Sequence, residues 1–237
     1  VSDSVPISVD MGGNLLVSLY LPAATGVSTW HSDAFDRTYA GAGDHTGDTR
    51  YLAMATRIAQ YLQGSWDPGT CGGGMWWDRE HTYKNAVTSG LYLRLTAAVH
   101  RRTPGDTVWL QRARTAADWY LASGMINADG LVNDGLTTDC RNNGGIVWTY
   151  NQGLLIGGLH ELWLDTEDPH LLSEAHRLAD AAVTHLTRDG VLTESCDIGE
   201  ASCDDNQKQF KGILVRYLAE LGYRPFLARQ WAAIWSA

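Results

Sequence analysis

The stretch DTRYLAMATRIA, at residues 48–59, recurs in altered form as DTVWLQRARTAA at 106–117 and as DPHLLSEAHRLA at 168–179. The three stretches share the pattern Asp-x₃-Leu-x₂-Ala-x₃-Ala, whose apolar positions follow one face of an α-helix. The Asp is placed to accept hydrogen bonds from the unpaired backbone N–H groups of a first helical turn. The two small Ala side chains leave a flat face for close packing. The pattern therefore predicts three amphipathic helices, each of which begins at its Asp.

Helices of a second kind are expected between these three. Residues 85–99, 152–164 and 211–221 are apolar on nearly every face, which is typical of a helix buried on all sides. The repeating unit is then a buried helix, a short turn, an exposed helix and a long loop. Stacked hairpins of this kind form either an open solenoid or a closed α/α toroid.

Three long loops favour the toroid over the open solenoid. They cover residues 64–82, 123–149 and 188–209, and each lies at the mouth of a buried helix. Loops longer than about 12–15 residues in a compact domain are usually functional. All three are expected on one face, which places a site at one rim. We therefore expect a single all-α domain over residues 1–237, an α/α toroid of helical hairpins, with the open solenoid as the alternative.

Composition excludes some partners and favours another. The net charge is −9 and no Lys/Arg cluster stands out, so we expect no nucleic-acid partner. No apolar run reaches the roughly 18 residues of a membrane span. Ten Trp and ten Tyr against three Phe suit the binding of sugar rings, because Trp and Tyr combine an apolar face with a polar edge. The alternative, aromatic residues that only fill the core, would predict more Phe.

The four cysteines all lie in predicted loops and lack the C-x-x-C spacing of a zinc site. Cys196 and Cys203 bracket a short polar loop, as a local disulfide would, and Cys71 and Cys140 would then form a second pair. Two disulfides predict an oxidising compartment and a secreted or cell-surface protein. The alternative is four reduced thiols.

Six collinear stretches of the chain resemble family 76 of the glycoside hydrolases. They are TGDTRYL (46–52), WDPGTCGGGMWW (66–77), YKNAVTSGLYLRLTA (83–97), SGMINADGLVNDG (123–135), WTYNQGLLIGGLHELW (148–163) and FKGILVRYLAEL (210–221). The resemblance covers roughly residues 46–222 and implies an (α/α)6 fold with endo-α-1,6-mannanase activity. Residues 1–45 do not match and are expected to be diverged or incomplete.

The resemblance also implies a pair of adjacent catalytic aspartates before residue 46, and this sequence has no such pair there. Asp33 and Asp36, in WHSDAFDRTY (30–39), are the nearest carboxylates and are our candidate catalytic residues. On a helix they would share a face. The alternative is that Asp33 caps a helix and Asp36 pairs with Arg37. The adjacent pair Asp204-Asp205 is interpreted as a helix cap or a solvated loop.

The candidate substrate-binding residues lie in the predicted rim loops and at the starts of the buried helices. They are Trp76, Trp77, Asn85, Asp134, Trp148, Tyr150, Asn151 and Gln152. The alternative reading makes these residues caps, turns and braces. We expect no metal and no cofactor, because the eight His lack metal-ligand spacing.

The resemblance implies a glycoside hydrolase-like protein that acts on α-mannan by retaining endo-α-1,6-mannosidase chemistry. Its partner would be an oligosaccharide or polysaccharide of the mannan type. The alternative is a non-catalytic glycan-binding or structural relative that has lost the catalytic aspartate pair. Two close carboxylates in the cleft would favour the hydrolase, and their absence would favour the non-catalytic relative.

Overall fold

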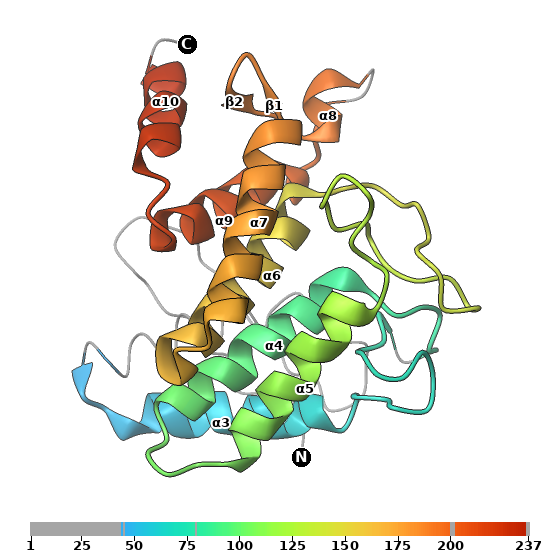
Figure 1. Cartoon of the computed structure of the whole chain (residues 1–237), viewed down its shortest axis with the longest axis vertical. Coiled ribbons are helices and arrows are strands. Elements are labelled where there is room, and N and C mark those ends of the chain that lie inside the picture. The colour runs from blue at the N-terminus through green and yellow to red at the C-terminus, as the bar shows by residue number, and fades with distance from the viewer. Residues whose placement is uncertain (1–43, 45, 79, 200–201, 236–237) are drawn as a thin grey trace, which may run out of the picture.

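The computed structural model describes residue 44 and residues 46–78, 80–199 and 202–235, and these segments are mainly helical (Figure 1). In chain order the elements are α3 (Thr49–Gln63), α4 (Ala86–Arg101), α5 (Val108–Ala122), α6 (Thr149–Thr166), α7 (Pro169–His185), β1 (Thr187–Arg188), β2 (Val191–Leu192), α8 (Ser195–Ile198), α9 (Gln207–Glu220) and α10 (Arg224–Trp235). The two strands form one short antiparallel hairpin. The prediction of an all-α fold is confirmed.

The repeated aspartates begin their helices as the sequence pattern predicts. Asp48 caps α3 and Asp168 caps α7, each by accepting a hydrogen bond of 2.9 Å from the N–H two residues ahead. Asp106 accepts three hydrogen bonds, from the N–H groups of Val108, Trp109 and Leu110 at 2.9–3.3 Å. Because these carboxylates satisfy free donors of the first turn, they set where the three outer helices start.

Helices α4 and α6 are the buried helices of the fold, and their side chains are enclosed along nearly their whole length. Helix α6 packs between α4 and α9, while α5 and α7 cover the outside as the hairpin partners of α4 and α6. Two glycines make this packing close. A Cβ at Gly158 would lie 2.7 Å from Cγ of Leu93 on α4, and one at Gly153 would lie 2.8 Å from Cα of Leu214 on α9. No Cβ fits at either position.

The third predicted buried helix differs from the other two. Helix α9 buries only one stripe, made by Phe210, Leu214, Tyr217 and Leu218. The reason is its neighbours: α9 packs along α6 on one side, whereas its contact with α10 is slight. The expectation that residues 211–221 are enclosed on all sides is therefore wrong.

Helix α10 and the strand pair lie outside the predicted elements. Gln230 of α10 joins them, since its Oε1 accepts from the N–H of Leu192 at 2.8 Å and its Nε2 donates to the carbonyl of Gly190. None of the helices in the described part of the chain combines the length and the apolar character of a membrane span.

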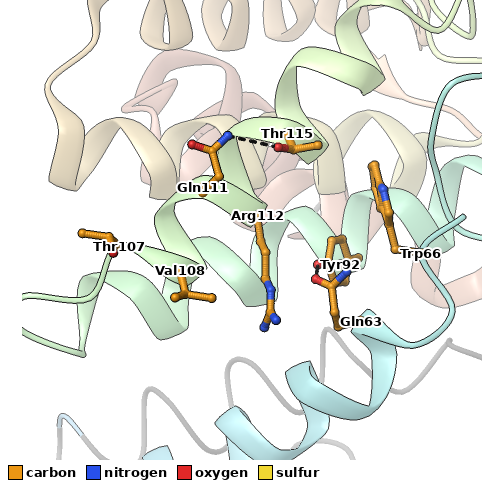
Figure 2. Close-up of a pocket in the computed structure, with 8 residues that line it drawn as sticks. All are labelled: Gln63, Trp66, Tyr92, Thr107, Val108, Gln111, Arg112 and Thr115. Carbon is orange, nitrogen blue, oxygen red and sulfur yellow. Dashed lines mark hydrogen bonds between the residues drawn. The ribbon is translucent and has the colours of Figure 1, made fainter. Parts of the chain in front are cut away.

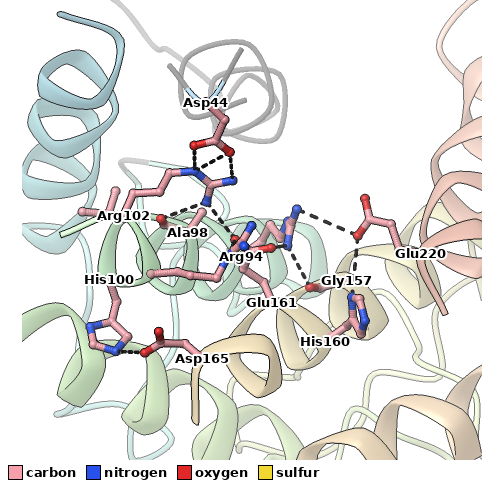
Figure 3. A network of polar contacts seen from close by, with 12 residues as sticks. Asp44, Arg94, Ala98, His100, Arg102, Gly157, His160, Glu161, Asp165 and Glu220 are labelled. Carbon is pink, nitrogen blue, oxygen red and sulfur yellow. Dashed lines mark hydrogen bonds and ion pairs between the residues drawn. The ribbon is translucent and has the colours of Figure 1, made fainter. Parts of the chain in front are cut away.

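A buried polar network joins the C-terminal halves of α4 and α6 (Figure 3). The Glu161 carboxylate, 2% exposed, accepts from Nε of Arg101 and Nη1 of Arg102, both at 2.8 Å, and from Nη1 of Arg94. Burial by itself raises the pKa of Glu161, but the attraction from Arg94 and Arg101 outweighs it, and the pKa falls from 4.5 to about 2. Arg102 also pairs with Asp44 at 2.8 Å.

We expect Glu161→Gln to destabilise the fold at pH 7 by about 3–5 kcal/mol, because it leaves buried guanidinium groups without their anion. The Glu161 pKa is lower in the folded state. Its stabilising contribution is therefore complete above its ordinary pKa of 4.5 and is lost as the pH falls towards about 2. Urea denaturation from pH 7 to pH 2 measures both effects. Glu174→Gln removes a half-exposed helix-surface pair with Arg177 and is the control, with a cost below about 0.5 kcal/mol. Equal costs for the two variants would contradict the expectation.

Candidate functional site

The rim loops come together at the N-terminal ends of α4 and α6, as the sequence pattern predicts (Figure 1). The N–H of Asn85 donates to the carbonyl of Met75 at 3.3 Å, and the N–H of Ala86 donates to the carbonyl of Asp134 at 2.9 Å. Loops 64–82 and 123–149 therefore both hydrogen-bond to the residues that begin α4. The disulfide Cys71–Cys140 joins the same two loops covalently.

The second predicted disulfide, Cys196–Cys203, is also formed. It closes the loop that contains α8, and with Asp197 it makes the one group among the described residues with the composition of a metal site. The disulfide bond removes the thiolates that a metal would need. We therefore assign this group to structure.

Lys84 holds the first loop against α4. Its side chain is 1% exposed, and its Nζ donates to the carbonyls of Gly74 at 2.9 Å and Asp67 at 3.0 Å. The same ammonium lies 4.2 Å from the centre of the Trp76 ring. Burial lowers the Lys84 pKa, and hydrogen bonding to Asp67 acts against that shift. Lys84 is thus a positioning residue that was absent from the predicted set, although it directly precedes the candidate residue Asn85.

Asn85, Tyr83 and Asp134 form a connected polar cluster at the start of α4. Asn85 caps the helix by accepting from the N–H of Thr88 at 3.2 Å, and its Nδ2 donates to the Tyr83 hydroxyl oxygen at 2.8 Å. The Tyr83 hydroxyl in turn donates to Oδ2 of Asp134 at 2.9 Å. Burial raises the pKa of Asp134, and the hydrogen bond from Tyr83 and the nearby Asn151 amide act in the opposite direction. Tyr83 is thus a site residue that was absent from the predicted set.

The first turn of α6 supplies the other half of the site. The Gln152 side chain is fully engaged: its Oε1 accepts from the N–H of Val132 at 2.7 Å, and its Nε2 donates to the carbonyls of Val132 and Trp148. Asn151 is equally buried, yet neither atom of its amide makes a hydrogen bond of normal geometry with a described residue. A buried amide without partners costs free energy, so it is available to a group that brings its own donors and acceptors.

The candidate aromatic residues lie in different surroundings. The rings of Trp148 and Tyr150 both pack edge-to-face on Phe210, with centroid distances of 5.3 and 4.2 Å. The Trp76 ring lies parallel to His81, with centroids 4.8 Å apart. Trp77 lies beside Tyr83, 6.3 Å between centroids, and is half-buried. Trp77 therefore lies next to the polar cluster around Asp134.

A second buried carboxyl lies at the start of α6 and was not predicted. Glu194 is 0% exposed, and its Oε1 accepts from the N–H of Thr149 at 2.8 Å and from the Thr149 hydroxyl. Its Oε2 has no hydrogen-bond partner among the described residues. Burial raises the Glu194 pKa, against the hydrogen bonds from Thr149. After burial itself, the charge of Asp134 is the main cause that raises the Tyr150 pKa, and Glu194 adds to it.

The candidate catalytic residues Asp33 and Asp36 lie outside the described residues. Asp204 and Asp205 are described, and they serve the start of α9: Asp204 accepts from the N–H groups of Asn206 and Gln207 at 2.8 and 2.9 Å. Asp205 pairs with Lys208 at 2.7 Å. The interpretation of this acidic pair as a cap is confirmed.

The sequence model described as Glycosyl hydrolase family 76 matches residues 26–233. The chain is 29% identical to the mannan endo-1,6-alpha-mannosidase DFG5 of Saccharomyces cerevisiae over 78% of its own length. It covers only 42% of that relative, so it spans less than half of the relative's length.

Solved structures show the same likeness. The Lin0763 protein of Listeria innocua matches 85% of the chain with a TM-score of 0.70 and 28% identity, and the chain covers 57% of it. An inactive variant of the alpha-1,6-mannanase GH76A of Salegentibacter sp. HEL1_6, in complex with alpha-1,6-mannotetrose, matches 83% of the chain with a TM-score of 0.67 and 27% identity. The chain covers 56% of that structure. Together with the helical hairpins described above, these matches establish the α/α toroid architecture.

The different environments of Asn85 and Asn151 yield a prediction. Asn85→Leu should destabilise the fold by at least about 2 kcal/mol, because it removes a helix cap and leaves the Tyr83 hydroxyl without its donor. Asn151→Leu should change stability by less than about 0.5 kcal/mol or increase it, because it replaces an unpartnered amide by an apolar group of similar shape. Urea denaturation of the two variants measures the difference. If Asn151→Leu lowers the free energy of unfolding as much as Asn85→Leu does, the Asn151 side chain serves only to stabilise the fold.

Proposed function

Because the chain belongs to glycosyl hydrolase family 76, we propose that it acts on α-1,6-linked mannan, which it holds at the rim formed by the loops before α4 and α6. The observation that carries the proposal is the buried Asn151 amide, which makes no hydrogen bond of normal geometry with a described residue and lies beside the half-buried Asp134 carboxyl. Relatives are named mannan endo-1,6-alpha-mannosidases, and a structural neighbour holds alpha-1,6-mannotetrose. A neutral sugar would supply the missing hydrogen-bond partners.

The chemistry of the rim suits a neutral sugar. Asn151 offers one donor group and one acceptor, and Asp134 offers acceptor oxygens held in place by Tyr83. The half-buried Trp77 offers an apolar surface beside them. We propose Trp76, Asn85, Trp148, Tyr150 and Gln152 as the remaining members of the substrate-binding set, of which Asn85 and Gln152 act by holding the backbone.

Catalysis is proposed to use Asp33 and Asp36. A retaining glycoside hydrolase needs two carboxyl groups about 5–5.5 Å apart across the scissile bond. One carboxylate attacks the anomeric carbon and forms a glycosyl–enzyme bond while the other protonates the departing oxygen. The second group then deprotonates a water molecule, which breaks that bond with overall retention of configuration.

A second candidate function is supported by one observation in the sequence. No two adjacent aspartates occur before residue 46, where the resemblance places the catalytic pair. A chain without that pair would still have the rim cluster and would bind the glycan without cleaving it. Either function fits a secreted or cell-surface protein, and the two disulfides support that location.

Binding is tested by titration with α-1,6-mannotetraose. We expect Trp77→Ala and Asp134→Asn each to weaken the affinity at least tenfold, because each removes a surface or a charge that the sugar contacts. Trp235→Ala, which changes an exposed Trp on α10, is the matched control and should alter the affinity less than twofold. Isothermal titration calorimetry at pH 7 gives the values. Unchanged affinity in both rim variants would exclude the rim as the site.

Cleavage is tested by the release of reducing ends from α-1,6-mannan. If the proposed chemistry holds, Asp33→Asn and Asp36→Asn should each lower kcat by at least a thousandfold, while the affinity for mannotetraose stays within threefold. An active parent whose two variants keep full rate would show that other acids act. A parent that binds mannan and releases no reducing ends would support the non-catalytic function.

A further inference from the structure

A hollow separate from the rim lies between α3, α4 and α5 (Figure 2). Its volume is about 440 Å³, which is within the usual range of about 300–1,000 Å³ for small-molecule sites. It is lined by Gln63, Trp66, Tyr92, Thr107, Val108, Gln111, Arg112 and Thr115. None of these residues belongs to the proposed mannan site, so the hollow needs its own explanation.

The rings of Trp66 and Tyr92 pack together at one wall of the hollow, and neighbouring side chains hold them in place. Trp66 and Tyr92 have ring centroids 5.4 Å apart and are tilted by 32°. The edge of Trp66 also meets Trp119, with centroids 5.7 Å apart, and the Tyr92 hydroxyl donates to Oε1 of Gln63. Tyr92 is 1% exposed and supports Trp66 from behind, so the partly exposed Trp66 ring is the apolar surface of this wall. Such a ring suits the C–H face of a sugar.

Arg112 supplies the only positive charge among the residues that line the hollow. In Figure 2 its side chain extends from α5 towards the space between Val108 and Gln63. The guanidinium lies 4.3 Å from the centre of the Trp109 ring, a contact through its flat face that keeps its N–H edges turned away from the ring. Unlike Arg94 and Arg101, it forms no ion pair with a carboxylate of the described residues. A planar guanidinium of this kind matches a carboxylate or a phosphate through paired hydrogen bonds.

Neutral groups complete the lining on the α5 side. Nε2 of Gln111 donates to the Thr115 hydroxyl oxygen at 3.3 Å, which leaves the Gln111 carbonyl and the Thr115 O–H for other partners. Thr107 adds another hydroxyl at the start of α5. The hollow thus combines an apolar wall, hydroxyl-binding groups and one cation.

We propose that the hollow is a second carbohydrate site that binds a hexose carrying one acidic group, a carboxylate or a phosphate. The sugar ring lies against Trp66, which Tyr92 supports from behind, and the acidic group pairs with Arg112. The site is independent of the proposed mannan-cleaving function, because it shares no residue with the proposed substrate-binding set and needs no bond to be broken.

The test uses isothermal titration calorimetry and the indole N–H signals of the ¹⁵N-labelled protein. The probes are mannose 6-phosphate, glucuronic acid, mannose and inorganic phosphate. We expect at least one charged sugar to bind and to shift the Trp66 signal, and mannose and inorganic phosphate to bind at least tenfold more weakly. The better of the two charged sugars identifies the acidic group.

Variants then test whether the Arg112 side chain binds the acidic group of the sugar. Arg112→Gln should weaken binding of the charged sugar at least tenfold, and Arg112→Lys should weaken it about threefold, because a lysine keeps the charge without the planar fork. Arg114→Gln, two residues along α5 and outside the hollow, should change it less than twofold. Trp77→Ala at the rim should leave it unchanged, which separates this site from the mannan site.

Four results would overturn the proposal. They are mannose binding as tightly as the charged sugars, inorganic phosphate doing so, full affinity in Arg112→Gln, and signal shifts at Trp77 in place of Trp66. Thermal melting shows which variants are folded. If Arg112→Gln does not fold, the four probes and the Trp66 signal of the parent protein still decide the question.

Discussion

The close approach of α6 to its two neighbours is the constraint on which the rest of the structure depends. A Cβ at Gly158 would overlap Leu93 of α4, and a Cβ at Gly157 would lie 2.2 Å from the Tyr217 ring of α9. Helices can approach this closely only where small residues face the neighbour. Because α6 is held on both sides, its first turn is fixed against the start of α4. The rim cluster of Asn85, Asp134 and Asn151 exists because these two helix ends meet.

The acidic side chains at the two ends of the buried helices have pKa shifts in opposite directions. At the C-terminal end, Glu161 is surrounded by arginines, and their charges lower its pKa in spite of burial. At the N-terminal end, Asp134 and Glu194 receive hydrogen bonds from neutral groups only, so burial prevails and raises their pKa values. At the first end the buried charges are paired, so the loss of one partner would leave the others uncompensated. The second end keeps buried polar groups with unused bonding capacity, which is what a site for a neutral, hydroxyl-rich ligand requires.

The fold was largely predictable because its signals are local. The repeated Asp-Leu-Ala-Ala pattern places helix starts, and Asp48, Asp106 and Asp168 do cap α3, α5 and α7. The prediction failed for α9, because whether an apolar helix is enclosed depends on its neighbours and not on its own sequence. The site was predictable in part. Tyr83 and Glu194 were missed, since their partners Asp134 and Thr149 lie 51 and 45 residues away in the chain.

The sequence by itself determined the helical periodicity, the helix starts and the pairing of Cys196 with Cys203, because a helix cap, an amphipathic stripe and a short disulfide loop each arise within a few residues. Only the tertiary structure decided which polar residues at the rim have partners. Gln152 and Asn151 are neighbours of similar chemistry, yet the backbone of Val132 satisfies the Gln152 amide, whereas the Asn151 amide makes no hydrogen bond of normal geometry with a described residue. The physical reason is that hydrogen bonding in a buried site depends on the direction of each side chain and on what the fold brings within about 3 Å of it.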